Sequence, residues 1–199
     1  MSSNVRKLRV LGISGSLRQG SFNTAALRAA VELAPDYMTI QIADISALPL
    51  YNEDVRQAGY PAPVEAFRAQ IAEADAVLFA TPEYNYSVSG VLKNAIDWAS
   101  RPPAQPFEGK PVAIMGASGG VLGTARAQYH LRQMLVFLNA FPVNKPEVFI
   151  AQAAQKFDAA GKLTDETARD LISKLLVSLA EWTLRLKQPA PALPVAKSA

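Results

Sequence analysis

The chain has 199 residues, half of them hydrophobic, and carries 20 lysines and arginines against 17 aspartates and glutamates. This length favours one domain with a sizeable core. The net charge is +3, which suits anionic small ligands. The lysines and arginines form no cluster in the sequence, so the charge does not indicate nucleic-acid binding. The absence of cysteine excludes disulfides and thiolate chemistry. Because the first residues lack a signal peptide's apolar segment and no apolar run would span a bilayer, we expect a cytoplasmic protein that is not inserted in a membrane.

The first predicted elements surround a loop of small residues. Residues 8–13 are largely apolar, as in a buried strand, and the first loop, residues 14–21, is rich in glycine and serine. A helix is predicted over residues 23–34, with Ser21 or Asn23 as its cap and Leu27 and Val31 on its inner face. Loop amides and the positive end of the helix dipole point at one place, which predicts an anion site, with phosphate as the first candidate.

The rest of the chain alternates strands with helices. Strands are predicted at residues 38–42, 76–80, 112–115 and 147–150, helices at 61–74, 88–100, 124–138 and 165–186, and a long polar loop at 44–59. The second strand alternates apolar and polar residues, which is typical of a sheet edge. These elements predict an α/β fold, a three-layer sandwich whose five-stranded parallel sheet has the order 2-1-3-4-5 with helices on both faces. We expect residues 1–187 to form this single domain and the Pro- and Ala-rich residues 188–199 to form a disordered tail.

Three loops follow predicted strands 1, 3 and 4, and this strand order brings them to one crevice. The second loop, residues 82–87, places Tyr84, Asn85 and Tyr86 at the end of an apolar strand. Aromatic rings and backbone amides together suit a flat heteroaromatic ligand. The third loop, residues 116–120, is glycine-rich, which allows the backbone to approach a ligand closely.

Three better-known motifs are nearly matched here, and each lacks an essential part. Residues 15–21 resemble a phosphate-binding loop, but Ser21 stands where the lysine needed for phosphoryl transfer would be. The dinucleotide pattern G-x-G-x-x-G is absent, although Asp44 could mimic its ribose-binding acid. Residues 116–120 match the hydrolase pattern G-x-S-x-G around Ser118, but His130 is the only histidine, the helical pattern carries it away from Ser118, and residues 119–129 contain no acid. We therefore expect a phosphate that is held and not transferred, and no metal site.

Two long stretches, LGISGSLRQGSFN and ATPEYNYSVSGVLKNAIDWASR, resemble the flavodoxin-like NAD(P)H-dependent FMN reductases. The run QYHLRQMLVFLNA is similar to their quinone and chromate reductase branch, and the resemblance extends from Leu8 to about Leu186. It implies bound FMN, with NADPH or NADH as co-substrate. It also implies that the cofactor-binding residues are Ser16, Leu17, Arg18, Gln19, Gly20, Ser21, Phe22 and Asn23 for the phosphate, Pro82, Glu83, Tyr84, Asn85 and Tyr86 beside the isoalloxazine ring, and Ser118 in the loop that closes over it.

The resemblance implies an oxidoreductase that passes hydride from the reduced nicotinamide to FMN and then two electrons to a quinone-type acceptor; chromate, azo compounds and free flavin stay open as acceptors. No side chain is assigned a catalytic role, since the flavin carries the chemistry. A homodimer or homotetramer is also implied, with Arg126, Tyr129 and His130 as interface candidates. The position of the polar loop suggests that Tyr51 and Asn52 line the acceptor pocket.

Two other classes of protein remain as alternatives. One is a flavodoxin-like carrier that binds FMN without substrate turnover, although such carriers tend to be acidic and this chain is slightly basic. The other is a nucleotide-binding regulatory protein without a redox role.

Overall fold

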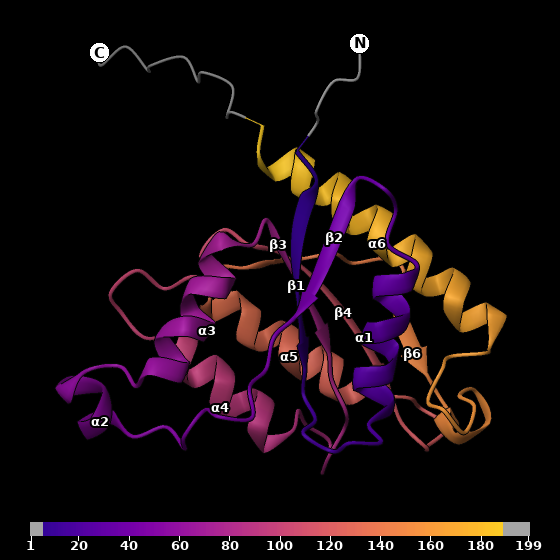
Figure 1. Cartoon of the computed structure of the whole chain (residues 1–199), viewed down its shortest axis with the longest axis horizontal. Helices are drawn as coiled ribbons and strands as arrows, with labels where there is room; N and C mark the ends of the chain where they lie inside the picture. Colours follow the sequence, from indigo (N-terminus) through magenta and orange to yellow (C-terminus); the bar gives the residue numbers. More distant parts are fainter. Residues whose placement is uncertain (1–5, 189–199) are drawn as a thin grey trace, which may run out of the picture.

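A parallel β-sheet with helices on both faces forms the centre of the computed structural model, which describes residues 6–188 (Figure 1). Its strands are β1 (Leu8–Ser14), β2 (Met38–Ile42), β3 (Ala76–Ala80), β4 (Pro111–Ala117), β5 (Phe141–Pro142) and β6 (Val148–Ile150). The sheet order is β2-β1-β3-β4-β5, and β6 pairs with β4 as well. The predicted order is therefore confirmed, with β2 at the edge.

The outer edge of β4 is shared by two short strands, of which only β6 was expected. Pro111 and Val112 pair with β5, whereas Met115, Gly116 and Ala117 pair with β6. The two residues of β5, one of them a proline, are too few for an alternating pattern, and its existence depends on the neighbouring strand.

The helices are α1 (Phe22–Glu32), α2 (Glu53–Ala58), α3 (Ala62–Glu73), α4 (Gly90–Ala99), α5 (Ala125–Phe137) and α6 (Glu166–Leu186), with a 3₁₀ turn η1 at Ala153–Gln155. Helices α1 and α6 cover one face of the sheet, and α3, α4 and α5 cover the other (Figure 1). Successive residues of β3 explain this, because Leu78 packs into the α1–α6 core while Val77 and Phe79 pack into the opposite one. A strand covered on both faces must be apolar throughout, as predicted for β3 and β4.

Helix α2 lies inside the stretch that was predicted to be a polar loop. Asn52 caps it by accepting a hydrogen bond from the Asp54 amide at 2.8 Å. None of its residues is buried, so it has no apolar stripe by which periodicity could have revealed it. In α1, Ser21 is the cap, and Val31 is 42% exposed on the outer face and not inward as predicted.

The predicted tail lies, apart from Gln188, outside the described residues. Within residues 6–188, no helix combines the length and the apolar character needed to cross a membrane.

Candidate functional site

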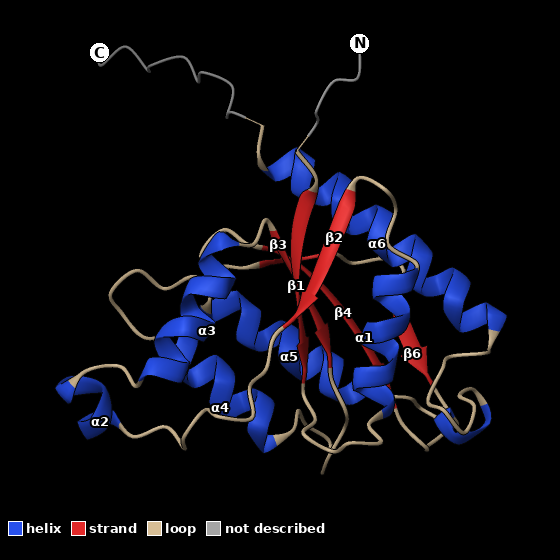
Figure 2. Cartoon of the chain, in the orientation of Figure 1, coloured by secondary structure: helices blue, strands red, loops and turns tan. Residues whose placement is uncertain are grey.

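A cleft of about 240 Å³ opens beyond the C-terminal ends of β1, β3 and β4. Figure 2 shows the loops that follow β1 and β3 together at the lower edge of the sheet. The cleft is lined by all three predicted loops and the first turn of α1, namely Ser16, Arg18, Ser21, Phe22, Asn23, Pro82, Glu83, Tyr84, Ala117, Ser118 and Gly119. The predicted convergence of the three loops on one crevice is what the structure shows.

Nine of the fourteen residues predicted to bind the cofactor line this cleft, and Leu17, Gln19, Gly20, Asn85 and Tyr86 do not. Among these five residues, Leu17 is 50% exposed and Tyr86 is 71% exposed. Ala117 and Gly119 line the cleft but were not predicted. Both belong to the third loop, whose glycines were expected to let the backbone approach a ligand, but neither was named as a cofactor-binding residue.

The N-terminus of α1 faces the cleft. Ser21 Oγ accepts from the Thr24 amide at 3.2 Å, and the Thr24 hydroxyl lies 2.8 Å from Ser14 Oγ. The first two helical amides, those of Phe22 and Asn23, have no acceptor within residues 6–188. Two donors at the positive end of a helix dipole therefore remain available at the cleft for an anion.

Arg18 adds a positive charge at the same place. It belongs to the cleft wall, and its Cζ lies 5.7 Å from the centroid of the Phe22 ring. Phe22 packs in turn on Phe157, with ring centroids 5.1 Å apart. The exposed Arg18 side chain therefore packs beside an aromatic pair at the start of α1.

The second loop is a tight turn closed by two backbone hydrogen bonds. The Tyr84 amide donates to the Ser87 carbonyl at 3.0 Å, and the Ser87 amide donates to the Tyr84 carbonyl at 2.9 Å. The two central residues, Asn85 and Tyr86, have φ angles of 48° and 66°. Positive φ is unusual for a bulky residue such as tyrosine and costs on the order of 1–2 kcal/mol, so neighbouring contacts must hold the turn.

Glu83 does not offer a free carboxylate to a ligand. Its side chain is only 5% exposed, and Oε2 accepts hydrogen bonds from the amides of Arg126 at 3.1 Å and Ala127 at 3.2 Å. Its other oxygen pairs with the Arg126 guanidinium, and this contact raises the pKa of Arg126. Glu83 thus occupies the N-terminus of α5, whose own cap residue, Thr124, makes no side-chain hydrogen bond there.

Ser118 and His130 are not hydrogen-bonded to each other, as a hydrolase would require. Ser118 Oγ donates to the Gly123 carbonyl at 2.5 Å and accepts from the Gly120 amide at 3.3 Å. His130 is exposed, and its Nδ1 lies 2.8 Å from Ser87 Oγ in the second loop. Ser118 and His130 therefore have different hydrogen-bonding partners and do not form the pair that a hydrolase needs.

Tyr51 and Asn52 do not line the cleft. The Tyr51 amide donates to Asn94 Oδ1 at 2.8 Å, its ring packs on Trp98 with centroids 4.9 Å apart, and Asn52 caps α2. The loop that carries them is held against α4 instead.

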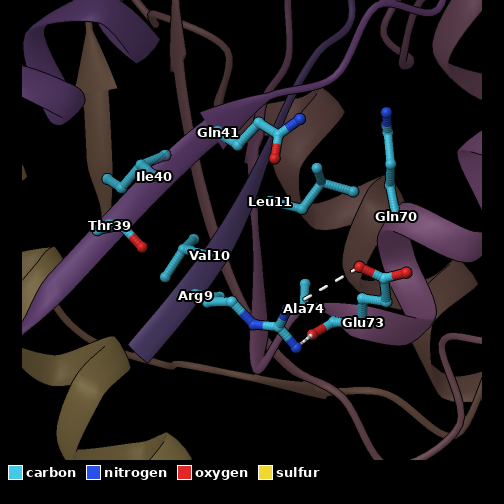
Figure 3. Close-up of a pocket in the computed structure, with 9 residues that line it drawn as sticks. All are labelled: Arg9, Val10, Leu11, Thr39, Ile40, Gln41, Gln70, Glu73 and Ala74. Atoms are coloured by element: carbon cyan, nitrogen blue, oxygen red, sulfur yellow. Dashed lines mark hydrogen bonds and ion pairs between the residues drawn. The ribbon is translucent and has the colours of Figure 1, made fainter. Parts of the chain in front are cut away.

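A second hollow of about 230 Å³ lies over β1 and β2 beside α3 (Figure 3). Arg9 crosses it and donates from Nη2 to the Glu73 carbonyl at 2.5 Å. Its walls come from the middle of the strands, and it contains none of the predicted site residues.

Comparison with known proteins agrees with the fold. The profile of the NADPH-dependent FMN reductase family matches residues 8–155. An NAD(P)H-dependent FMN reductase of Pseudomonas aeruginosa is 64% identical over 180 residues, which are 90% of this chain and 97% of that protein. The quinone reductase of Escherichia coli K12 is 48% identical over 184 residues, covering 91% and 98%.

Among solved structures, the flavoenzyme NAD(P)H:(acceptor) oxidoreductase from Paracoccus denitrificans superposes with a TM-score of 0.81 at 36% identity, over 89% of this chain and 98% of that one. The resemblance to FMN reductases and to their quinone reductase branch is therefore confirmed. The chain belongs to the NADPH-dependent FMN reductase family and is an oxidoreductase that uses FMN as cofactor and a reduced nicotinamide as co-substrate.

Proposed function

We propose that the cleft at the ends of β1, β3 and β4 holds FMN and that this enzyme reduces a quinone-type acceptor with NADPH or NADH. The observation that carries the proposal is the contrast between two helix N-termini beside the cleft. The first amides of α1 lack acceptors in the described part of the chain, whereas the start of α5 is filled by Glu83. An anionic group such as the FMN phosphate is therefore directed to α1.

The residues present suit a mononucleotide. Ser16, Ser21 and Arg18 surround the α1 amides with hydroxyls and a positive charge, while Pro82 and Tyr84 offer flat walls on the other side of the cleft. The volume of about 240 Å³ is below the roughly 300–1,000 Å³ usual for small-molecule sites, so it encloses only part of such a ligand. An open remainder is what a cofactor needs when a second molecule must reach it.

Bound FMN supplies the redox chemistry, accepting a hydride from the nicotinamide and passing two electrons on. The chain's own residues bind and orient it. The α1 amides and Arg18 hold its anionic end, the second loop borders the ring, and the third loop covers it through Ala117, Ser118 and Gly119. Related proteins in Escherichia coli and Arabidopsis thaliana are named quinone reductase and NADPH:quinone oxidoreductase, which supports a quinone acceptor here. Chromate, azo compounds and free flavin are further acceptors that we propose for assay.

The visible spectrum of the purified protein, recorded before and after addition of NADPH, is the most direct test. We expect flavin absorption that bleaches on reduction, together with steady-state NADPH or NADH oxidation in the presence of a quinone. Bound flavin without turnover with either nucleotide would instead support the electron-carrier alternative. Colourless protein that takes up no FMN would overturn the proposal and favour a regulatory nucleotide-binding role.

We further propose that the enzyme is a cytoplasmic homodimer or homotetramer that associates through α5. This helix presents Tyr129, Val136 and Phe137 with 51%, 80% and 81% of their surface exposed. Large apolar side chains gathered on one helix favour association. Light scattering after size-exclusion chromatography should give a molar mass that is a multiple of the 21.4 kDa chain mass. A monomer at assay concentration would contradict this proposal.

A further inference from the structure

Three residues connect the second loop to the start of α5. Glu83 accepts hydrogen bonds from the first-turn amides of α5, and its carboxylate also pairs with the Arg126 side chain. The Arg126 guanidinium lies 3.8 Å from the centroid of the Tyr86 ring, a distance at which a cation is attracted to the face of an aromatic ring. Arg126 therefore contacts both ends of the segment from Glu83 to Tyr86.

The conformation of that segment needs support. Asn85 and Tyr86 both have left-handed backbone angles, and such residues keep them only where the surroundings over-determine them. Tyr86 is 71% exposed, and its ring stacks on Arg126. This contact adds to the two backbone hydrogen bonds of the turn and to the contact between Ser87 Oγ and His130 Nδ1. Arg126 Nε is itself buried and has no partner in the described residues, a cost that its ion pair and stacking must offset.

Arg126 also determines the charge beside the ligand. The Glu83 side chain is 5% exposed and lines the same cleft as the α1 amides. A buried carboxylate without a counter-ion would repel an anionic ligand, and the repulsion is strong where water is excluded. With Arg126 in place the pair is neutral, and the positive end of α1 is not opposed.

We propose that Arg126 is a positioning residue for the FMN site, acting through Glu83 and Tyr86: it holds the second loop in its bound shape and neutralises Glu83. The inference rests on the proposed function, since it assumes that the cleft takes FMN. From the sequence, Arg126 was named only as an interface candidate, and its role beside the cleft was not predicted.

The test measures the dissociation constants of FMN and of riboflavin for the apoprotein by quenching of flavin fluorescence. Arg126→Met removes the charge but keeps much of the side-chain volume. We expect it to weaken FMN binding by about ten- to a hundredfold, in line with the loss of a charge-assisted contact. Riboflavin lacks the phosphate, so its binding should weaken less than that of FMN. Arg126→Lys keeps a charge beside Glu83 and should restore part of the affinity.

The Glu83→Gln background tests whether Arg126 affects FMN binding by neutralising Glu83. In that background no carboxylate needs a counter-ion, so Arg126→Met should weaken FMN binding several-fold less than it does in the wild type. Arg185→Met is the matched control, because Arg185 also lies over an aromatic ring, Trp182 at 5.7 Å, but on α6 and outside the cleft. It should bind FMN as the wild type does.

Three results would overturn the inference. One is unchanged FMN affinity in Arg126→Met. Another is a loss that is equal with and without Glu83→Gln and follows the thermal midpoint of the apoprotein, which would make Arg126 a stabiliser of the fold only. The third is a loss that occurs only where the molar mass also changes, which would assign Arg126 to a subunit interface. Wild-type protein that binds no FMN would contradict the proposed function itself, a different outcome from wild-type binding that Arg126→Met leaves intact.

Discussion

The Asn23 carboxamide and the Ala117 backbone make a pair of hydrogen bonds. Asn23 Nδ2 donates to the Ala117 carbonyl at 2.9 Å, and the Ala117 amide donates to Asn23 Oδ1 at 2.9 Å. Both residues are buried, and the pair joins the first turn of α1 to the last residue of β4. Two walls of the cleft are thereby fixed relative to each other, while the backbone amide of Asn23 stays available to a ligand.

Asn23→Ala should lower the free energy of unfolding by about 2–4 kcal/mol, since it leaves the Ala117 amide and carbonyl buried without partners. Urea unfolding measures this. Asn144→Ala, at an exposed asparagine before β6, is the control and should change stability by no more than about 0.5 kcal/mol. Equal effects of the two substitutions would show that the pair contributes nothing specific.

Arg18→Ala should weaken FMN binding by about 1–3 kcal/mol, because a charge-assisted contact to the phosphate is lost. Fluorescence titration of the apoprotein gives the two dissociation constants. The difference should shrink at high salt, where an exposed charge is screened. If the affinity is the same in both proteins, the Arg18 side chain points to solvent in the complex.

Gly116→Ala should destabilise the protein by about 1–3 kcal/mol or more, because a Cβ there would overlap with Thr124 Oγ1 and with the Thr81 backbone carbonyl. Gly90→Ala is the matched control. It lies at the start of α4 with no atom within 4 Å of an added Cβ, so alanine should be neutral or stabilise by up to about 1 kcal/mol. The midpoint temperatures of thermal unfolding of the two variants should shift in opposite directions or differ by several degrees. Similar midpoints would contradict the packing argument.

Ser118→Ala should keep NADPH-dependent quinone turnover within a few-fold of the wild type. The hydroxyl is engaged in the third loop with Gly123 and Gly120, so its removal costs about 1 kcal/mol of stability and no chemical step. Steady-state assays give the comparison. Loss of all activity with normal FMN content would mean that Ser118 takes part in the reaction.

Asp75→Asn should make stability less dependent on acid pH. Burial alone would raise the pKa of Asp75, but hydrogen bonds from the Arg9 amide at 2.8 Å and from Lys187 at 2.5 Å outweigh it and lower the pKa below 3.8. A carboxylate with a lowered pKa in the folded state stabilises it above the ordinary value and loses that contribution as the pH falls. The wild type should therefore be more stable than the variant by about 1–3 kcal/mol at neutral pH. Urea unfolding should show this gap shrinking below pH 3.8, and a gap that is constant with pH would count against the charge.

The amino-acid sequence by itself predicted most of the helices and strands and the order of the strands in the sheet, but not α2 or β5. The apolar run Ala76–Ala80 favours a strand covered on both faces, and the small residues before Ser21, followed by an apolar stripe, favour the start of a helix. These signals are local, because the periodicity of a strand or a helix is recognised from residues that lie a few positions apart in the sequence. They were sufficient to predict the sheet order and the edge of the sheet at which the cleft opens.

Tertiary structure alone decided what the side chains at that edge do. Glu83 lines the cleft, where its carboxylate also caps α5, and Asn23 holds Ala117 through its carboxamide. The partners lie 43 and 94 residues apart in the chain, so no local pattern contains them. The same holds for β5, which exists through its pairing with β4, and α2 escaped prediction because it buries nothing. A hydrogen-bonding side chain acquires its role from the atoms that folding brings to it, and those atoms are distant in the sequence.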